Sequence, residues 1–266
     1  APRDVVASSG SDLYVLDSAR QQVMLVDRGT GDRQVFSGPG VGQGPNFSRP
    51  IGMVAVGTPF SGSDLIVADA DLDNLLSVDS GGDRATFSGT DAFGGIRAIG
   101  RLGTNRVAVL TANDITLVDT STEIRTLLPR RTPSFVNPIA ITGDSAGTLY
   151  VLDRTTTGPI IYAVPTSGLN SGQRLLAYDA RSDDPAQQTG AITDPVNGDI
   201  RLQTPEDLVT DPAGNLIITD STLNVVVRYN PAMAVRTGSV ISRGAGGRPL
   251  VSPSTVAMAG SEVLVL

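Results

Sequence analysis

The sequence has 266 residues and a net charge of −7, it contains no histidine, cysteine or tryptophan, and all 20 of its basic residues are arginine. These absences exclude a Ser-His-Asp triad, cysteine- or histidine-ligated metals, a lysine Schiff base and a P-loop built from this chain. The acidic balance argues against a nucleic-acid partner, and no apolar run approaches the roughly 20 residues of a membrane-spanning helix.

A short strand motif recurs along the chain and usually ends in aspartate. Its four clear copies are Asp12–Asp17, Asp64–Asp69, Thr148–Asp153 and Asn215–Asp220, with Arg106–Thr111 as a degenerate copy. Glu262–Leu266 is a sixth copy, which ends one residue before the expected aspartate. A short apolar strand precedes each copy, and two further strand-like runs follow each complete one, with Gly, Pro, Asp and Asn between them.

The repeat predicts an all-β fold, because four strands in about 40–50 residues are typical of a β-propeller blade. We expect one domain over residues 1–266, with five complete blades and a two-stranded partial sixth. The predicted blades cover about residues 2–38, 49–90, 95–129, 136–178, 204–244 and 253–266. The polar segment 179–203 is predicted to be an inserted loop between the fourth and fifth blades.

The partial sixth blade predicts an open strand edge at Glu262–Leu266. An unpaired edge is a template for strand exchange or for a dimer through Glu262–Leu266, whereas a short, covered edge would form neither, and the sequence leaves both outcomes open.

The fifth repeat carries the most specific motif. From Pro205 it shows Leu-Val and Asp at the first strand, the Gly214-Asn215 turn, the strand-end Asp220-Ser221, and Asn224 and Arg228 further on. This pattern resembles the NHL repeat, with Asp207 in place of the usual glycine. The resemblance implies a six-bladed NHL-like propeller, a superfamily that contains both enzymes and binding modules, so the fold alone leaves the function open.

The recurring aspartates have two readings. Asp17, Asp69, Asp153 and Asp220 would form a ring of carboxylates, or each would accept backbone hydrogen bonds as a turn cap, which repetition in four blades favours. Asp69, Asp71 and Asp73 resemble the start of a calcium loop, but Asn74 stands where that loop needs glycine. We therefore predict no cofactor, with calcium as the alternative.

The starts of the first strands line the channel of a propeller. Alignment of the repeats places Arg3, Ile51, Arg97, Ile139, Glu206 and Pro253 in one layer, and Asp4, Gly52, Ala98, Ala140, Asp207 and Ser254 in the next. The charged members Arg3, Asp4, Arg97, Glu206 and Asp207 are the candidate ligand-binding residues at the channel mouth. They bind a polar ligand, since arginine donates two hydrogen bonds to a carboxylate or phosphate, or they pair with one another.

Three functions remain open from the residues. The first is a non-catalytic binding or scaffold module for a protein or peptide, with Tyr178, Arg181 and the 179–203 insertion as contributors. The second is a divalent-metal hydrolase similar to gluconolactonase, with Glu206 at a suitable depth. The third is self-assembly through the incomplete blade. The all-arginine composition suggests a GC-rich bacterial source, and the start Ala1-Pro2-Arg3 suggests a secreted or periplasmic protein.

Overall fold

The computed structural model describes residues 2–7, 12–56, 63–180, 192–232, 238–245 and 248–266, and all regular secondary structure in these ranges is β-strand. The chain divides into two compact units, residues 1–128 with Leu266 and residues 129–265. No helix long and apolar enough to cross a membrane occurs in the described ranges. The predicted β-propeller with five four-stranded blades and a two-stranded sixth sheet is confirmed.

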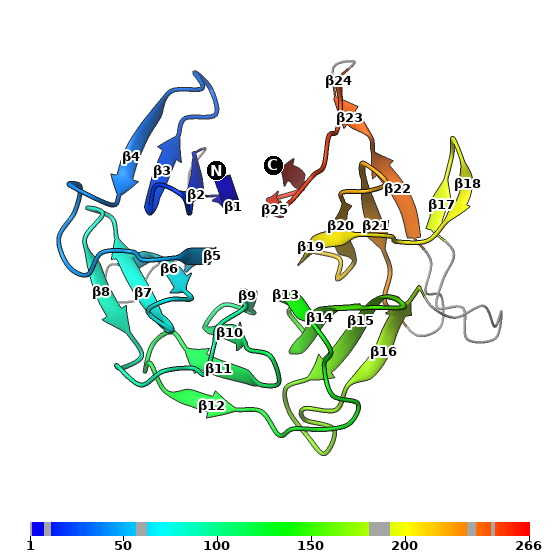
Figure 1. Ribbon diagram of the computed structural model, residues 1–266, viewed down its shortest axis with the longest axis horizontal. Coiled ribbons are helices and arrows are strands. Elements are labelled where there is room, and N and C mark those ends of the chain that lie inside the picture. The colour runs from blue at the N-terminus through cyan, green and yellow to red at the C-terminus, as the bar shows by residue number, and fades with distance from the viewer. Residues whose placement is uncertain (1, 8–11, 57–62, 181–191, 233–237, 246–247) are drawn as a thin grey trace. The chain divides into compact units, whose positions relative to one another are not determined.

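The first unit contains three blades, each an antiparallel meander of four strands (Figure 1). The first strands of neighbouring blades, β1, β5 and β9, lie side by side. The blades are β1 (Pro2–Ala7), β2 (Leu13–Asp17), β3 (Gln22–Val26), β4 (Arg33–Ser37); β5 (Pro50–Ala55), β6 (Ser63–Asp69), β7 (Asn74–Asp79), β8 (Arg84–Phe87); and β9 (Ala98–Leu102), β10 (Arg106–Leu110), β11 (Ile115–Asp119), β12 (Arg125–Leu127).

The second unit contains blades four and five and two small sheets. Its strands are β13 (Pro138–Gly143), β14 (Thr148–Thr155), β15 (Gly158–Pro165), β16 (Leu175–Asp179); β17 (Ile192–Asp194), β18 (Gly198–Ile200); β19 (Pro205–Thr210), β20 (Leu216–Asp220), β21 (Val225–Tyr229), β22 (Gly238–Ser242); β23 (Gly244–Ala245), β24 (Arg248–Pro249); and β25 (Val256–Ala259), β26 (Glu262–Val265).

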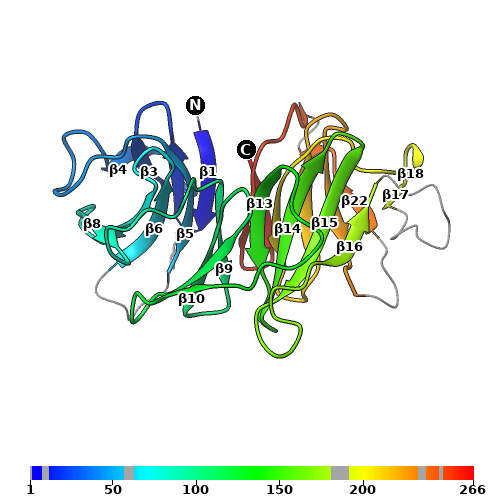
Figure 2. The same cartoon turned by 60° about the horizontal axis from the view of Figure 1, so that its bottom comes forward.

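The insertion between blades four and five is not only a loop. Where the sequence predicts a loop over 179–203, β17 and β18 form a hairpin, and β17 pairs in parallel with β22. Blade five thereby becomes a six-stranded sheet with the order β18-β17-β22-β21-β20-β19, and the hairpin lies beyond β22 at its outer edge (Figure 2). Arg181, a predicted contributor to partner binding, lies outside the described residues.

Both faces of a central strand are buried because blades stack on both sides of it. In β6, Leu65 and Val67 pack into a cluster shared with blade one, whereas Ile66 and Ala68 pack into a cluster shared with blade three. Successive side chains of a strand point to opposite faces, so this strand needs a continuous apolar run rather than alternation. The motif copies in the sequence are such runs.

The strand-end aspartates act as turn caps, as the repetition predicts. Asp220 is fully buried and accepts hydrogen bonds from Gln203 N and Thr204 N before β19, at 2.7 and 3.0 Å. Its other oxygen accepts from Thr222 N and Leu223 N, at 3.1 and 3.0 Å, in the turn after β20. Each such carboxylate therefore ties the segment that enters a blade to the turn between its second and third strands. The same arrangement recurs in Asp69, which binds Ser48 N, Arg49 N, Asp71 N and Leu72 N, and in part in Asp153, which binds Val136 N and Asn137 N.

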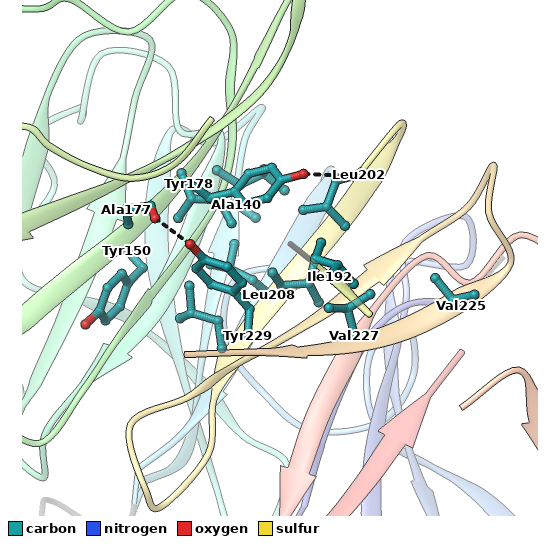
Figure 3. Close-up of a cluster of buried hydrophobic side chains, with 14 residues drawn as sticks. Ala140, Tyr150, Ala177, Tyr178, Ile192, Leu202, Leu208, Val225, Val227 and Tyr229 are labelled. Atoms are coloured by element: carbon teal, nitrogen blue, oxygen red, sulfur yellow. Dashed lines mark hydrogen bonds between the residues drawn. The ribbon is translucent and has the colours of Figure 1, made fainter. Parts of the chain in front are cut away.

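The core between blades four and five contains three tyrosines, Tyr150, Tyr178 and Tyr229, and the last two form hydrogen bonds to the backbone (Figure 3). The Tyr178 hydroxyl accepts a hydrogen bond from Leu202 N at 2.9 Å, and the Tyr229 hydroxyl donates one to Ala177 O at 2.9 Å. The two rings meet edge to face with their centroids 5.4 Å apart. Burial raises the pKa of Tyr178 to about 12. Tyr178 is thus a core residue, and its predicted place on a partner-binding surface is wrong.

Candidate functional site

The first strands of four blades begin with the same irregularity. Their initial prolines pair with the strand-end aspartates, and the pairing then skips one residue, as in Pro2↔Asp17 followed by Asp4↔Leu16. The skipped residue is the extra member of a β-bulge, a feature that redirects a side chain and is common beside binding sites. The bulge residues are Arg3, Ile51, Ile139 and Glu206.

The register agrees with the predicted layers in five blades and corrects the sixth. In blade three, Arg97 N donates to Leu110 O at 2.8 Å directly before β9, which places Arg97 level with the bulge residues. In the sixth sheet, Val256 pairs with Val265. This pairing aligns Pro253 with the prolines that begin the first strands of the other blades, and it aligns Ser254 with the bulge residues. The predicted alignment of the sixth sheet is therefore wrong by one residue.

Asp4 connects the first strands of blades one and two. Its Oδ1 accepts from Val5 N and its Oδ2 accepts from Met53 N of β5, both at 2.7 Å. A Cβ atom at the neighbouring Gly52 would make a tight contact with Ile99 Cγ2 at 3.2 Å but an ordinary one with Asp4 Oδ2 at 3.5 Å. Asp4 thus satisfies a backbone donor on the inner edge of the neighbouring blade, where sheet pairing offers no acceptor.

Asp207 makes the equivalent contacts in the second unit. Its Oδ1 accepts from Leu208 N at 2.8 Å, and its Oδ2 accepts from Val256 N of β25 at 3.0 Å. The Thr255 hydroxyl donates to the same Oδ2 at 2.7 Å. Asp4 and Asp207 occupy the same position of blades one and five, so a shared role as connectors of adjacent first strands accounts for both.

Glu206 is held by an arginine that sequence reasoning missed. Arg154 Nη2 donates to Glu206 Oε2 at 2.9 Å and to Pro205 O at 2.8 Å, and the Ser221 hydroxyl donates to Glu206 Oε1 at 2.7 Å. The Arg154 and Glu206 side chains keep 34% and 30% of their surface exposed, so the pair remains open to solvent. Arg154 directly follows the strand-end Asp153. In blades one, two and five the residue after the strand-end aspartate is serine or alanine, so the arginine in blade four is a departure that the sequence could have revealed.

The five predicted channel-mouth residues divide between the two units. Arg3, Asp4 and Arg97 belong to residues 1–128, and Glu206 and Asp207 belong to residues 129–265. Arg3 Nε donates to Ile51 O at 3.4 Å. Within the second unit, Glu206 forms an ion pair with Arg154.

The three carboxylates of the calcium-like segment serve separate structural roles. Asp69 caps backbone groups, and Asp71 pairs with Arg49 at 2.6 Å. Asp73 accepts from Gly94 N, Gly95 N and Ile96 N, which fixes the entry to blade three. Within the described ranges, no group of three or more Asp, Glu, His or Cys side chains is arranged to hold a metal ion.

Comparison with known proteins supports the fold. No protein-family model and no curated protein match the sequence. Among solved structures, a gluconolactonase from Xanthomonas campestris is 10% identical, with 99% of this chain and 82% of that chain covered and a TM-score of 0.68. Virginiamycin B lyase from Staphylococcus aureus is 12% identical, with 99% and 76% covered and a TM-score of 0.63.

A third similar structure is the PQQ-bound aldose sugar dehydrogenase from Streptomyces coelicolor, which is 13% identical, with 99% and 87% covered and a TM-score of 0.59. At these identities the similarity establishes the β-propeller fold alone. Because the neighbours include different enzymes, the function has to be argued from the residues of this chain.

Proposed function

We propose that the protein is a binding propeller rather than an enzyme, and that a polar ligand or a protein partner is recognised within one unit, at the bulge residues of its first strands. The main observation behind this proposal is that the carboxylates at these positions are already hydrogen-bonded to protein groups. Asp4, Glu206 and Asp207 each accept at least two hydrogen bonds from protein groups and connect neighbouring blades or strands. Carboxylates used in this way support a rigid scaffold, on which exposed side chains can evolve to bind.

The exposed members of the layer are suited to polar recognition. Arg3 and Arg97 are exposed. Arg154 donates to protein acceptors only through Nη2 within the described ranges, and its Nε is buried there without a partner, so any contact with a ligand would use the terminal nitrogens. Such guanidinium groups can donate to carboxylate, phosphate or peptide carbonyl oxygens. The proposed ligand therefore presents acceptor oxygens.

We also propose that the repeats are of the NHL type and belong to a six-bladed propeller. The motif residues of the fifth repeat support this, because each has a structural task. Asn224 has a φ of 54° and accepts from Ser252 N at 2.7 Å, and Arg228 pairs with Asp211 at 3.4 Å. A repeat-family search seeded with the fifth repeat of related chains tests it: motif residues that vary freely at these positions would contradict it.

Metal-dependent hydrolysis is the second candidate, because Glu206 lies in a bulge and a gluconolactonase has a similar fold. Calcium titration with thermal unfolding, together with a lactone hydrolysis assay, separates the two functions. The binding proposal expects an unchanged melting temperature in millimolar calcium and no hydrolysis. The binding proposal would be refuted if the protein hydrolysed a lactone, if Glu206→Gln abolished this activity, and if the control variant Asp199→Asn kept it.

Self-assembly through β26 is the third candidate, because β26 pairs only with β25 in the sheets of the described residues. Light scattering over a range of protein concentrations tests this candidate. Dimers that dissociate when Leu264→Pro blocks strand pairing would support it, and a monomer at every concentration would exclude it.

A further inference from the structure

The β17–β18 hairpin repeats a turn of blade five with one exchange. The hairpin reads ITDPVNGDI over residues 192–200, and the turn between β19 and β20 reads VTDPAGNLI over residues 209–217. Both segments contain Thr-Asp-Pro, and both then carry one asparagine and one glycine in opposite order: Asn197-Gly198 in the hairpin and Gly214-Asn215 in blade five. The exchange creates the only Asn-Gly bond among the 266 residues.

The asparagine has the same structural task in both turns. Asn197 Nδ2 donates a hydrogen bond to Asp194 Oδ2 at 2.8 Å, and Asn215 Nδ2 donates one to Asp211 Oδ2 at 2.9 Å. In the hairpin, the other Asp194 oxygen accepts from Val196 N at 3.0 Å. The aspartate thus bonds both to the backbone and to the side-chain amide of its own turn, which closes the turn. The hairpin therefore depends on an amide at position 197.

Gly198 is required by the backbone of the hairpin. The loop of residues 195–197 joins β17 to β18, and Gly198, which pairs with Asp194, has a φ of 77°. A hairpin loop of this length is commonly closed by a glycine in the left-handed conformation, where a Cβ atom would be strained. The turn needs asparagine at 197 for the tether and glycine at 198 for the conformation, so it maintains an Asn-Gly bond.

Glycine after asparagine favours loss of the side-chain amide, because glycine carries no Cβ atom to hinder the approach of its own nitrogen. The backbone nitrogen of Gly198 attacks Cγ of Asn197 and forms a new N–C bond, which closes a succinimide ring. The side-chain nitrogen departs as ammonia and carries away the proton that the backbone nitrogen gives up. Water then opens the ring at either carbonyl and leaves aspartate or isoaspartate at position 197.

The position of the hairpin gives this reaction access. Asn197 is exposed, and the hairpin lies at the outer edge of blade five (Figure 2). Within the described residues, β18 pairs only with β17, and β17 is held to β22 by two residue pairs. A short element with so few pairs opens locally at low cost, which frees the Asn197 side chain from its tether. Asn215 lacks this access, because the next residue is Leu216, which is fully buried in β20.

We propose that Asn197 is a site of spontaneous deamidation, and that its conversion releases the β17–β18 hairpin from blade five. The Asp194 side chain is fully buried, and its Oδ2 also forms an ion pair with Arg243. After deamidation, a carboxylate oxygen would stand where Nδ2 now donates, so two acceptors would face each other without a proton between them. Isoaspartate also adds a methylene group to the backbone of the turn. Ile192, now fully buried in the core of blades four and five, then becomes accessible to solvent.

The first experiment follows the modification itself. The 266-residue protein is incubated in mildly alkaline buffer, and its tryptic peptides are mapped by mass spectrometry over time. Asn197 is the only asparagine in the peptide that ends at Arg201, and Asn170 is the only one in the peptide 155–174. Asn170 is also exposed but is followed by Ser171, so it serves as the internal control. We expect conversion at Asn197 to be at least about tenfold faster, which corresponds to about 1.4 kcal/mol in activation free energy. Two products of equal mass, aspartate and isoaspartate, identify the succinimide route, and equal rates at the two asparagines would overturn the proposal.

The second experiment tests the consequence. Asn197→Asp reproduces the aspartate product, and Asn170→Asp adds the same charge at an exposed position outside the hairpin. Trypsin cleavage after Arg201, which directly follows β18, reports on release of the hairpin. We expect Asn197→Asp to raise the cleavage rate about tenfold, since a hydrogen bond to a charged group is lost, and Asn170→Asp to leave it unchanged.

Far-ultraviolet circular dichroism of both variants confirms that the blades remain folded. Cleavage of Asn197→Asp at the wild-type rate, or equal acceleration by both variants, would overturn the release of the hairpin. Neither experiment uses a ligand, so the deamidation proposal and the binding proposal fail separately.

Discussion

Replacement of Asp220 by alanine is the sharpest test of the strand-end aspartate as a structural cap. The carboxylate is fully buried and accepts four backbone N–H groups, two before β19 and two after β20. Each hydrogen bond to a charged group contributes about 1.5–3 kcal/mol, but the four share one side chain and water can reach part of the vacated space. We expect Asp220→Ala to lower the free energy of unfolding by about 3–5 kcal/mol.

The measurement is equilibrium urea denaturation, and two further variants bracket the result. Asp220→Asn keeps one carbonyl oxygen for two of the four donors, so it should fall between wild type and alanine. Asp199→Ala removes an exposed carboxylate with one 3.5 Å hydrogen bond to Thr193, and it should change stability by less than about 0.5 kcal/mol. A loss for Asp220→Ala as small as that for Asp199→Ala would refute the capping role.

Three further changes probe blade five and its surroundings. Gly238→Ala should cost about 1–3 kcal/mol and expose the β17–β18 hairpin to limited proteolysis, because the new Cβ meets Ile192; unchanged proteolysis would contradict this. Thr219→Val should stabilise by up to about 1 kcal/mol in urea denaturation, because the Thr219 hydroxyl is buried without a partner in the described ranges; destabilisation would indicate a missed bond. Unfolded tyrosine loses its proton near pH 10 and Tyr178 near pH 12, so stability should fall as pH rises between these values, and Tyr178→Phe should flatten that fall in pH-dependent unfolding.

The blades were predictable because their signal is local. Apolar runs such as Leu65–Ala68 lie within one strand, and turn residues mark both ends, so strand type and order follow without knowledge of any contact. The caps were predictable for a related reason. An aspartate that recurs at one strand end in several blades must serve a need of every blade, and unsatisfied backbone donors at a turn are such a need.

The hairpin in the insertion was not predictable from the same signals. Strands β17 and β18 have three residues each, too short for a period to emerge from Ile192–Asp194. Their position depends on a partner in β22, where Gly238 leaves room for Ile192. A glycine inside a strand is a recognised sign of close approach by other chain, but nothing local identifies which segment approaches.

For the candidate site, the sequence predicted which residues lie at equivalent positions of the first strands, but it did not predict which side chains form pairs. Layer membership follows from strand register, so Arg3, Arg97 and Glu206 could be grouped in advance. Pairing within the layer depends on side chains that reach across blades, and Arg154 lies near the end of β14, the second strand of blade four, rather than on a first strand. An alignment of the repeats groups residues at equivalent positions. It therefore does not reveal a contact between residues at different positions of neighbouring repeats, such as Arg154 and Glu206.

Three contacts between an arginine and a phenylalanine ring, Arg84–Phe47, Arg125–Phe93 and Arg174–Phe135, illustrate the same limit. Arg84 and Phe47 belong to different parts of one repeat, and each looks ordinary alone: an arginine at a strand start and an apolar residue in a connection. Only the comparison of all three blades reveals that the pairing is a rule of the repeat. In a repeat protein, such a contact between unlike positions becomes visible only when the equivalent contacts of several repeats are compared in the structure.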